Sequence, residues 1–338
     1  MSKVTLITVD LAKDVFQVAG FNNRLSNDFN KRLKRREFGE FMAQQPPCEV
    51  VMEACYSSHY WGRRFQGMGH RVRLLPAQHV TPFVRGNKSD RNDTVAIAEA
   101  SRRPNIVDVP LKSITQQDIQ CLHRMRDLCV ARRTGLMNQT RGLLSEYGIV
   151  GGGGHTAFSR LLSEVVDPES GDISPVLKNQ FRAVRNEYQS LTDRIADILK
   201  ELTLIAKNDP LCQLLLTIPG IGVINATAIY SAIGNGSQFK SAREFAVWLG
   251  LTPKQRSSGN MFVSSGITKR GDSYLRKQLV HGARALLHRC RKKTDKLSHW
   301  ANQLVARRGA QKACVALAAR LARICWILLQ KQEPYRAM

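Results

Sequence analysis

The chain has 338 residues, of which 43% are hydrophobic, so it can bury the cores of two or three domains, and wholesale disorder is excluded. Its 51 basic and 27 acidic side chains leave a formal charge of +24. Because so large a surplus of one sign repels itself, a polyanionic partner is expected. Nucleic acid is a better candidate than an anionic membrane surface.

The sequence argues against a membrane span, a secretory signal and a metal site built on cysteine. The most apolar stretch, Ala313 to Leu329, is interrupted by Arg320 and Arg323, and the start reads as a strand rather than as a signal peptide. The eight cysteines include no C-x-x-C pair and no metal-ligand spacing. We therefore expect a cytoplasmic protein with reduced, mostly buried thiols and no membrane partner.

The first hundred residues alternate between strand-like and helix-like patterns. Strands are predicted at Val4–Val9, Val15–Gly20, Glu49–Met52 and Arg71–Leu75, and helices at Arg35–Gln44 and Asp93–Arg102. Strands that alternate with helices indicate an α/β domain with a central sheet.

Four acidic side chains stand at the ends of these elements. Asp10 and Glu53 each follow an apolar strand, and Asp90 and Asp93 open a helix on one of its faces. Taken singly, each aspartate is more often a strand terminus or a helix cap. Four carboxylates gathered together need cations, and Mg²⁺ prefers such oxygen ligands. Their joint layout therefore predicts a metal site that acts on phosphodiesters.

From Thr115 the pattern turns helical and basic, and four glycines at 151–154 predict a loop. Between Leu177 and Ile205, apolar residues recur at alternating spacings of four and three, which is a heptad seam of about four heptads. This seam predicts a coiled coil between subunits, and hence a homo-oligomer, either a dimer or a tetramer. The alternative is a long helix packed within its own subunit. The seam ends near Asn208-Asp209-Pro210.

A short turn follows the seam. Leu214–Ile229 places Pro-Gly-Ile-Gly between two apolar stretches, as in a helix-hairpin-helix element. The amides of Gly220 and Gly222 could then approach a phosphate closely. A purely structural corner is about equally expected from so short a motif.

The C-terminal third carries most of the surplus charge. Residues 251–338 hold 19 basic and three acidic side chains, which makes this region a main polyanion-facing surface. An irregular loop is predicted at Lys254–Arg270, and helices at Tyr274–Arg289 and Ala310–Gln330. Inside the loop, Ser257 and Ser258 stand between basic residues that would stabilise charge at phosphorus during serine attack. From the residues alone, a serine-rich loop whose basic side chains hold phosphates is favoured.

Eight motifs in order carry a family resemblance. They are T-V-D-L-A-K, V-M-E-A-C, N-K-S-D-R-N-D, I-P-G-I-G, F-A-V-W-L-G-L-T-P-K-Q-R-S-S-G, I-T-K-R-G-D-S-Y-L-R, H-G-A-R-A and A-x-A-A-R-L-A-R-I-C-W. Together they resemble the IS-110 family of insertion-sequence transposases, in its IS-1111 branch, over nearly the whole chain.

The resemblance implies an RNase H-like, RuvC-type α/β domain with a trailing basic helix over 1–150. A glycine linker and coiled coil would follow over 151–209. A mainly helical transposase domain with the helix-hairpin-helix and a catalytic serine would occupy 210–338. The implied DEDD tetrad that holds Mg²⁺ is Asp10, Glu53, Asp90 and Asp93. Ser258 is the implied nucleophile, and the expected phosphate clamps are Lys254, Arg256, Lys269, Arg270 and Arg276.

The resemblance also implies a recombinase of the bacterial cytoplasm and nucleoid that excises and inserts its own element. A structured non-coding RNA would guide it by pairing with donor and target DNA, through a phosphoserine intermediate at sites shared between subunits. Two alternatives stay open. One is a metal-dependent junction nuclease without serine chemistry, and the other is a catalytically silent nucleic-acid-binding protein.

Overall fold

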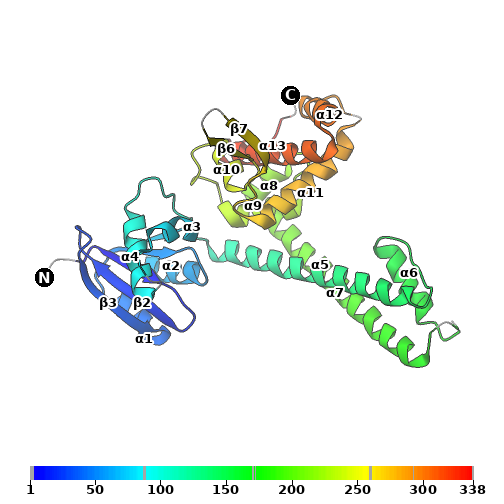
Figure 1. Ribbon diagram of the computed structural model, residues 1–338, viewed down its shortest axis with the longest axis horizontal. Coiled ribbons are helices and arrows are strands. Elements are labelled where there is room, and N and C mark those ends of the chain that lie inside the picture. Colours follow the sequence, from blue (N-terminus) through cyan, green and yellow to red (C-terminus); the bar gives the residue numbers. More distant parts are fainter. Residues whose placement is uncertain are drawn as a thin grey trace. The chain divides into compact units, whose positions relative to one another are not determined.

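The computed structural model describes residues 4–86, 89–169, 171, 173–258, 261–291 and 293–336. The chain forms two compact units that meet in sequence between Thr115 and Gln116 (Figure 1).

The first unit is built on a five-stranded sheet with the order β3-β2-β1-β4-β5. Its strands are β1 (Leu6–Asp10), β2 (Val15–Phe21), β3 (Asn27–Lys34), β4 (Glu49–Glu53) and β5 (Arg71–Leu75). β1, β4 and β5 are parallel, whereas β2 pairs antiparallel with both β1 and β3. This mixed sheet confirms the predicted α/β domain and is compatible with an RNase H-like domain.

Helices cover both faces of this sheet. The helices of the unit are α1 (Arg35–Ala43), α2 (Ser58–Gly67), α3 (Ala77–Val80), a 3₁₀ turn (Thr81–Phe83) and α4 (Asp90–Ser101). Phe38 of α1 and Trp61 of α2 pack on one face in a cluster with Phe16. Ile97 of α4 packs on the opposite face in a cluster with Val51. Strand residues therefore alternate between the two cores, which fixes the face that each side chain occupies.

The second unit is mainly helical. Its long helices α5 (Ile114–Ser145) and α7 (Pro175–Asn208) run side by side with the short α6 (His155–Val165) (Figure 1). Phe158 and Leu162 of α6 share a hydrophobic cluster with Leu144 of α5 and Phe181 of α7. The polar Ser174 caps α7 by accepting a hydrogen bond from the amide of Leu177, and Pro175 occupies its first turn.

The predicted seam of α7 packs within its own chain. Phe181 and Tyr188 lie in the cluster with α6, and Ile198 and Leu202 pack with Ile119 of α5. The long helix and its end at Asn208 are as predicted, but a coiled coil is not confirmed. The intramolecular alternative accounts for the burial of these seam residues.

The remaining elements form the largest core of the molecule. They are α8 (Pro210–Leu216), α9 (Val223–Ile233), α10 (Ala242–Trp248), β6 (Pro253–Ser258), β7 (Met261–Ile267), α11 (Ser273–Cys290), α12 (Lys296–Arg308) and α13 (Ala310–Lys331). α13 is long and apolar enough to cross a membrane, the one such helix in the described part of the chain. Leu317, Leu321 and Cys325 of α13 are fully buried in this core, as expected of the central helix of a folded domain.

The irregular loop predicted at Lys254–Arg270 is wrong, because β6 and β7 form an antiparallel hairpin there. Two glycines allow the backbone segments before and after this hairpin to lie in close contact at its base. A Cβ atom on Gly271 would lie 1.8 Å from the carbonyl oxygen of Trp248, and one on Gly250 would lie 2.1 Å from that of Arg270. Both glycines have positive φ, +79° at Gly271 and +68° at Gly250, which other residues adopt only with strain.

Candidate metal site and serine hairpin

Asp10 and Glu53 end neighbouring parallel strands. β1 ends at Asp10 and β4 ends at Glu53, and the ladder pairs Val9 with Met52 one residue earlier. Residues in register share a face of the sheet, and side chains alternate along a strand. Thr8 forms a hydrogen bond to α4, so Asp10, two residues later on the same strand, also lies on the face covered by α4. Glu53 is in register with Asp10 and lies on that face too, and both acids stand at the carboxyl ends of their strands.

Asp90 and Asp93 open α4. Ser89 caps this helix by accepting a hydrogen bond from the amide of Asn92 at 3.3 Å. The two aspartates stand one turn apart in the first turn, so their carboxylates share a face. The helix dipole favours negative charge at this end.

A buried hydrogen bond fixes α4 on the sheet beside these acids. The Thr8 hydroxyl donates to the backbone carbonyl of Thr94 at 2.9 Å, and both residues are fully buried. Thr94 directly follows Asp93, and Thr8 lies two residues before Asp10. This bond therefore holds the start of the helix against the end of β1.

Three of the four acids converge. One carboxylate oxygen from each of Asp10, Asp90 and Asp93 lies within 4.8 Å of the other two. An ion with bonds of about 2.1 Å takes opposite oxygens about 4.2 Å apart, so a small side-chain rotation would bring the set into magnesium geometry. Three carboxylates at this spacing repel one another without a cation. The donor set and its spacing therefore fit a divalent-metal site.

The Cys55 thiol links Glu53 to this cluster. Burial first, and the charges of Glu53 and Asp10 after it, raise the pKa of Cys55 to about 11. Cys55 is therefore a protonated thiol at neutral pH and a poor nucleophile. Among the described residues, Glu53 is not one of the three acids whose oxygens meet within 4.8 Å. It ends the adjacent strand at the same edge of the sheet.

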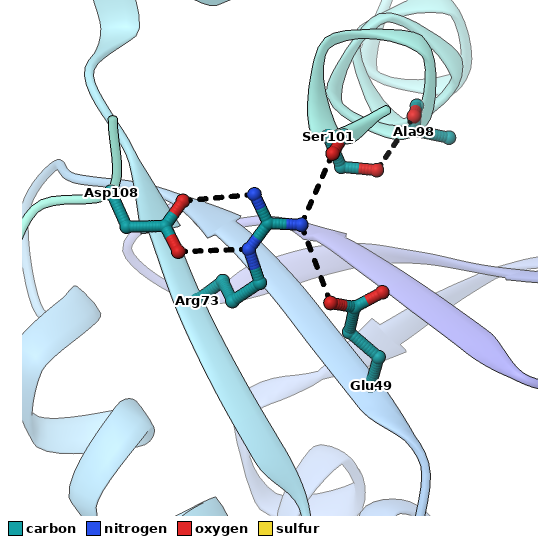
Figure 2. A network of polar contacts seen from close by, with 5 residues as sticks. All are labelled: Glu49, Arg73, Ala98, Ser101 and Asp108. Carbon is teal, nitrogen blue, oxygen red and sulfur yellow. Dashed lines mark hydrogen bonds and ion pairs between the residues drawn. The ribbon is translucent and has the colours of Figure 1, made fainter. Parts of the chain in front are cut away.

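A guanidinium holds the far end of α4, as Figure 2 shows. Arg73 of β5 donates to the carbonyl of Ser101, the last residue of α4, at 3.1 Å, and to Glu49 at 3.3 Å. Its other two nitrogens donate to Asp108 at 2.8 and 3.0 Å in a bidentate pair. These hydrogen bonds, above all the pair to Asp108, raise the pKa of Arg73. The helix that carries two of the acids is thus fastened to the sheet at both ends.

The structure places the backbone of Ser258 at the end of β6, where it pairs with Met261 of β7. The hairpin turn and the candidate nucleophile's side chain lie outside the described residues. The same holds for the other side chains singled out nearby, those of Ser257 and Arg256.

The predicted phosphate clamps divide into two kinds. Lys254, Lys269 and Arg270 are exposed, as a phosphate contact requires. Arg276 instead donates to the backbone carbonyls of Leu249 at 2.9 Å and of Arg270 at 3.1 Å. Arg276 therefore fastens the two ends of the hairpin to α11.

The two glycines of the predicted helix-hairpin-helix also differ. Gly220 has a φ of +87° and faces α11, where an added Cβ would lie 3.1 Å from the carbonyl oxygen of Gly282. Its missing side chain thus serves close packing of the turn on α11. Gly222 is exposed and caps α9, so it is the one at an open helix N-terminus.

Comparison with known proteins accounts for both regions. The DEDD-type IS110 transposase domain matches residues 7–149, and a domain described as "Transposase IS116/IS110/IS902 family" matches residues 212–299. A "Probable family 20 transposase" of Pseudomonas aeruginosa is 43% identical over 98% of both chains. The "Transposase for insertion sequence element IS1111A" of Coxiella burnetii is 41% identical over 99% of this chain and 92% of its own length. The "Transposase for insertion sequence element IS1328" of Yersinia enterocolitica is 36% identical over 97% of both chains.

The chain belongs to the IS110/IS116/IS902 family of transposases. The family resemblance deduced from the motifs is confirmed, and the protein is a DNA transposase of this family. The DEDD-type domain implies a divalent metal, and its match spans all four predicted acids. The second match spans the β6–β7 hairpin and the turn at Gly220.

Sequence reasoning missed several polar residues of this transposase beside the acids. Gln17 lies opposite Asp10 in the ladder of β1 and β2, and Asn30 of β3 joins it to Thr94. The short gap between the first two predicted strands could have indicated the Asp10–Gln17 pairing. The position of Asn30 could not be found, because β3 was not predicted as a strand.

Proposed function

We propose that this transposase is an RNA-guided recombinase that excises and inserts its own insertion sequence. Asp10, Glu53, Asp90 and Asp93 would hold Mg²⁺, and Ser258 would be the nucleophile. The observation that supports the proposal most is the convergence of Asp10, Asp90 and Asp93 within 4.8 Å, on the unit that matches the DEDD-type domain. Bound Mg²⁺ would neutralise charge on the scissile phosphate and its leaving oxygen.

The protein's own residues would divide the remaining work. The Ser258 hydroxyl would attack phosphorus, forming the bond between Oγ and phosphorus while the bond from phosphorus to a deoxyribose oxygen breaks. The serine proton would leave to solvent, and the departing oxygen would take up a proton. Lys254, Arg256, Lys269 and Arg270 would hold neighbouring phosphates; the first two precede Ser258 on β6, and the other two follow the end of β7. Arg276 would act by fixing the hairpin base.

The partners follow from the charge and the family. DNA is the substrate of the family, and we propose a structured non-coding RNA as the guide. The surplus of 16 basic side chains over 251–338 gives a surface for either backbone. A protein with these partners would work at the bacterial nucleoid. Its proposed domains are the DEDD-type domain at 1–150, the linker and long helix at 151–209, and the serine-containing transposase domain at 210–338.

We also propose a homo-oligomer, a dimer or tetramer, with α7 in its interface and with composite sites that join the acids of one subunit to the serine of another. Leu199 and Leu204 of α7 are 38% and 55% exposed, so part of the apolar surface of this helix is uncovered in a single chain. Light scattering on wild type and Leu204→Glu tests the proposed oligomer. The variant should have a lower molar mass than wild type, and a wild type with the molar mass of a monomer would contradict the proposal.

The decisive experiment is a search for a covalent protein–DNA adduct. Wild-type protein would be incubated with Mg²⁺, the element's RNA and labelled junction DNA, and resolved on a denaturing gel. The shifted band should disappear in Ser258→Ala and persist in Ser257→Ala and in Ser265→Ala, a control on β7. Strand cleavage without any adduct, equal in wild type and Ser258→Ala, would replace the serine mechanism by a metal-dependent junction nuclease.

The metal half of the proposal has its own test. Asp10→Asn keeps the size of the side chain and removes its charge, so we expect strand cleavage to fall on the order of 10³-fold while DNA binding persists. Asp14→Asn, an exposed acid in the next turn, should cleave like wild type. Absence of any strand cleavage with every divalent metal tried would favour a silent nucleic-acid-binding protein.

A further inference from the structure

Gln17 faces the acid cluster from the neighbouring strand. The antiparallel ladder of β1 and β2 pairs Asp10 directly with Gln17. Paired residues in such a ladder project from the same face, with Cβ atoms about 4.5–5.5 Å apart. Asp10 lies on the α4 face, and Gln17 is joined through Asn30 to Thr94 of α4 on that same face. An amide side chain thus stands beside the first acid of the site.

The orientation of this amide is set by a chain of hydrogen bonds that begins in α4. The Thr94 hydroxyl donates to the carbonyl of Arg91 at 2.8 Å, so its oxygen is left to accept from Asn30 Nδ2 at 3.2 Å. Asn30 Oδ1 then accepts from Gln17 Nε2. The donor and acceptor of each hydrogen bond are therefore fixed, because turning either amide around would place two oxygens or two N–H groups opposite each other.

The consequence is a fixed carbonyl oxygen. Gln17 Nε2 is turned toward Asn30 on β3, and the strand on the other side of β2 is β1, which carries Asp10. Gln17 Oε1 therefore points away from Asn30. In the described part of the chain, the bond to Asn30 is the one hydrogen bond that the Gln17 side chain makes. The hydrogen bond of Nε2 orients the carbonyl oxygen of Gln17, which accepts no hydrogen bond from the described residues.

A neutral acceptor suits this position. Three carboxylates already meet here, so a fourth charge on β2 would add repulsion without a metal, whereas an amide adds an acceptor at no such cost. Mg²⁺ usually keeps several waters when it binds carboxylates, and these waters need acceptors around them. Residues that orient the surroundings of a bound metal commonly change its affinity 10- to 100-fold when they are removed.

We propose that Gln17 is a positioning residue of the divalent-metal site, whose carbonyl oxygen accepts hydrogen bonds from the hydration shell of the ion beside Asp10. Asn30 and Thr94 orient it. The inference rests on the proposed function, because it requires that the acid cluster binds a divalent metal. It adds to the four acids a side chain from β2, together with a relay that ties it to the helix carrying Asp90 and Asp93.

Calorimetric titration of Mn²⁺ or Mg²⁺ into the full-length protein without nucleic acid tests the proposal. Gln17→Met keeps a side chain of similar length but has no amide, and we expect it to weaken metal binding by about 10-fold or more. Asn30→Ala keeps Gln17 but frees its amide to turn, so it should weaken binding less. Gln45→Ala, just after the end of α1 on the opposite face of the sheet, is the matched control and should bind like wild type.

Thermal unfolding of the same variants separates positioning from stability. If Gln17→Met binds metal like wild type and only melts at a lower temperature, Gln17 merely ties β2 to β3 and the proposal is wrong. If Asp10→Asn abolishes binding while Gln17→Met does not change it, the metal site stands and only the role of Gln17 fails. If the wild type itself binds no divalent metal, both the role of Gln17 and the proposed metal chemistry are overturned.

Discussion

Asp10 is placed by a strand with partners on both sides in a five-stranded sheet, whereas Ser258 ends a strand of a two-stranded hairpin. The helix carrying Asp90 and Asp93 is held at its start by the Thr8–Thr94 hydrogen bond and at its end by Arg73. An isolated two-stranded ladder is marginal by itself, so the hairpin depends on the fastening at its base. The first unit therefore builds its site at the edge of its central sheet, on elements anchored in its core, and the second carries its serine at the end of a two-stranded hairpin.

This difference teaches what each site should be sensitive to. The acids should be disturbed by anything that moves α4 on the sheet, because their spacing is the product of strand register and helix placement. The serine should be disturbed by changes at Gly250, Gly271 and Arg276, although none of these residues is near it in sequence.

The largest effect is expected from Gly271→Ala. The added Cβ would lie 1.8 Å from the carbonyl oxygen of Trp248, and the residue would have to keep a φ of +79°. The clash and the strained backbone should together lower the free energy of unfolding of the second unit by about 3 kcal/mol or more. Hydrogen exchange should show the loss of protection in β6, β7 and α11.

Gly266→Ala is the matched control for this change. It lies in β7 of the same hairpin, and nothing stands within 4 Å of its added Cβ. We expect it to alter stability by no more than about 0.5 kcal/mol. If Gly271→Ala also removed protection from β1 and β4, the two sites would not be fastened separately, and the comparison would break.

Acid should weaken both units, through the buried His123 in the second and the half-buried His59 in the first. Burial and the charge of Arg126 lower the pKa of His123 to about 4, and burial with Lys112 and Arg63 lowers the pKa of His59 to about 4. His123 contacts Tyr274 Oη at 2.9 Å and Thr227 Oγ1 at 3.0 Å. Because the Thr227 hydroxyl already donates to Val223, His123 donates from Nε2 and accepts from Tyr274 at Nδ1, which is the neutral form.

The sign of the pH effect follows from these lowered values. In the unfolded chain each histidine binds a proton below its ordinary pKa of about 6.5. In the folded chain the same histidine stays neutral until the pH falls to about 4. The stability contributed by each neutral histidine is thus full above pH 6.5 and is lost as the pH falls toward 4, by up to about 3 kcal/mol for His123 and by less for His59, where solvent screens the neighbouring charges. Denaturant titrations between pH 4 and 7 measure this. The free energy of unfolding should depend less on pH for the second unit in His123→Gln, and for the first unit in His59→Gln. An unchanged slope in either variant would contradict the assignment.

A smaller effect is expected from Arg73→Met. The variant leaves Asp108 and Glu49 without their guanidinium and the last carbonyl of α4 without its donor. We expect a loss of about 2 kcal/mol in the first unit, because hydrogen bonds to charged groups each contribute about 1.5–3 kcal/mol and Asp108 is partly solvated. Arg71→Met, on the same strand but exposed, should change stability little.

Arg73→Met also sharpens the comparison of the two sites. If α4 needs both fastenings, the variant should weaken metal binding as well as stability, while protection in the β6–β7 hairpin stays at the wild-type level. Full metal affinity in a destabilised Arg73→Met would mean that the Thr8–Thr94 end alone sets the spacing of the acids.

The sequence predicted elements whose residues face a core and missed those that do not. Strands β1 and β4 are apolar on both faces and β5 ends in the buried Leu74 and Leu75, and all three were found with their ends correct to within about two residues. β3 is mostly polar, with Phe29 and Leu33 as its two apolar residues, and lies at the sheet edge, so its periodic signal is weak. The hairpin at Ser258 was missed for the same reason, because Lys254 and Gln255 are polar and exposed.

The candidate site shows the same limit. The four acids could be predicted because each stands at the end of an apolar element, where local pattern and position coincide. Gln17, Asn30 and Arg73 act through strand register and through contacts between residues distant in sequence, which periodicity does not encode. The seam of α7 predicted a long helix correctly, but the pattern is the same whether the partner is α6 of the same chain or another subunit.

The smallest effect is expected at the ion pair between Lys277 of α11 and Asp127 of α5 in the second unit. The two side chains are 43% and 40% exposed, unlike Arg73 and Glu49 at 18% and 20%. Solvent screens an exposed pair, so Lys277→Met should cost no more than about 1 kcal/mol, and the difference from wild type should shrink further in about 1 M salt. Denaturant titrations at low and high salt measure this. A loss as large as that of Arg73→Met, insensitive to salt, would show that the second unit also depends on an ion pair shielded from solvent, and that a partly buried ion pair does not distinguish the two units.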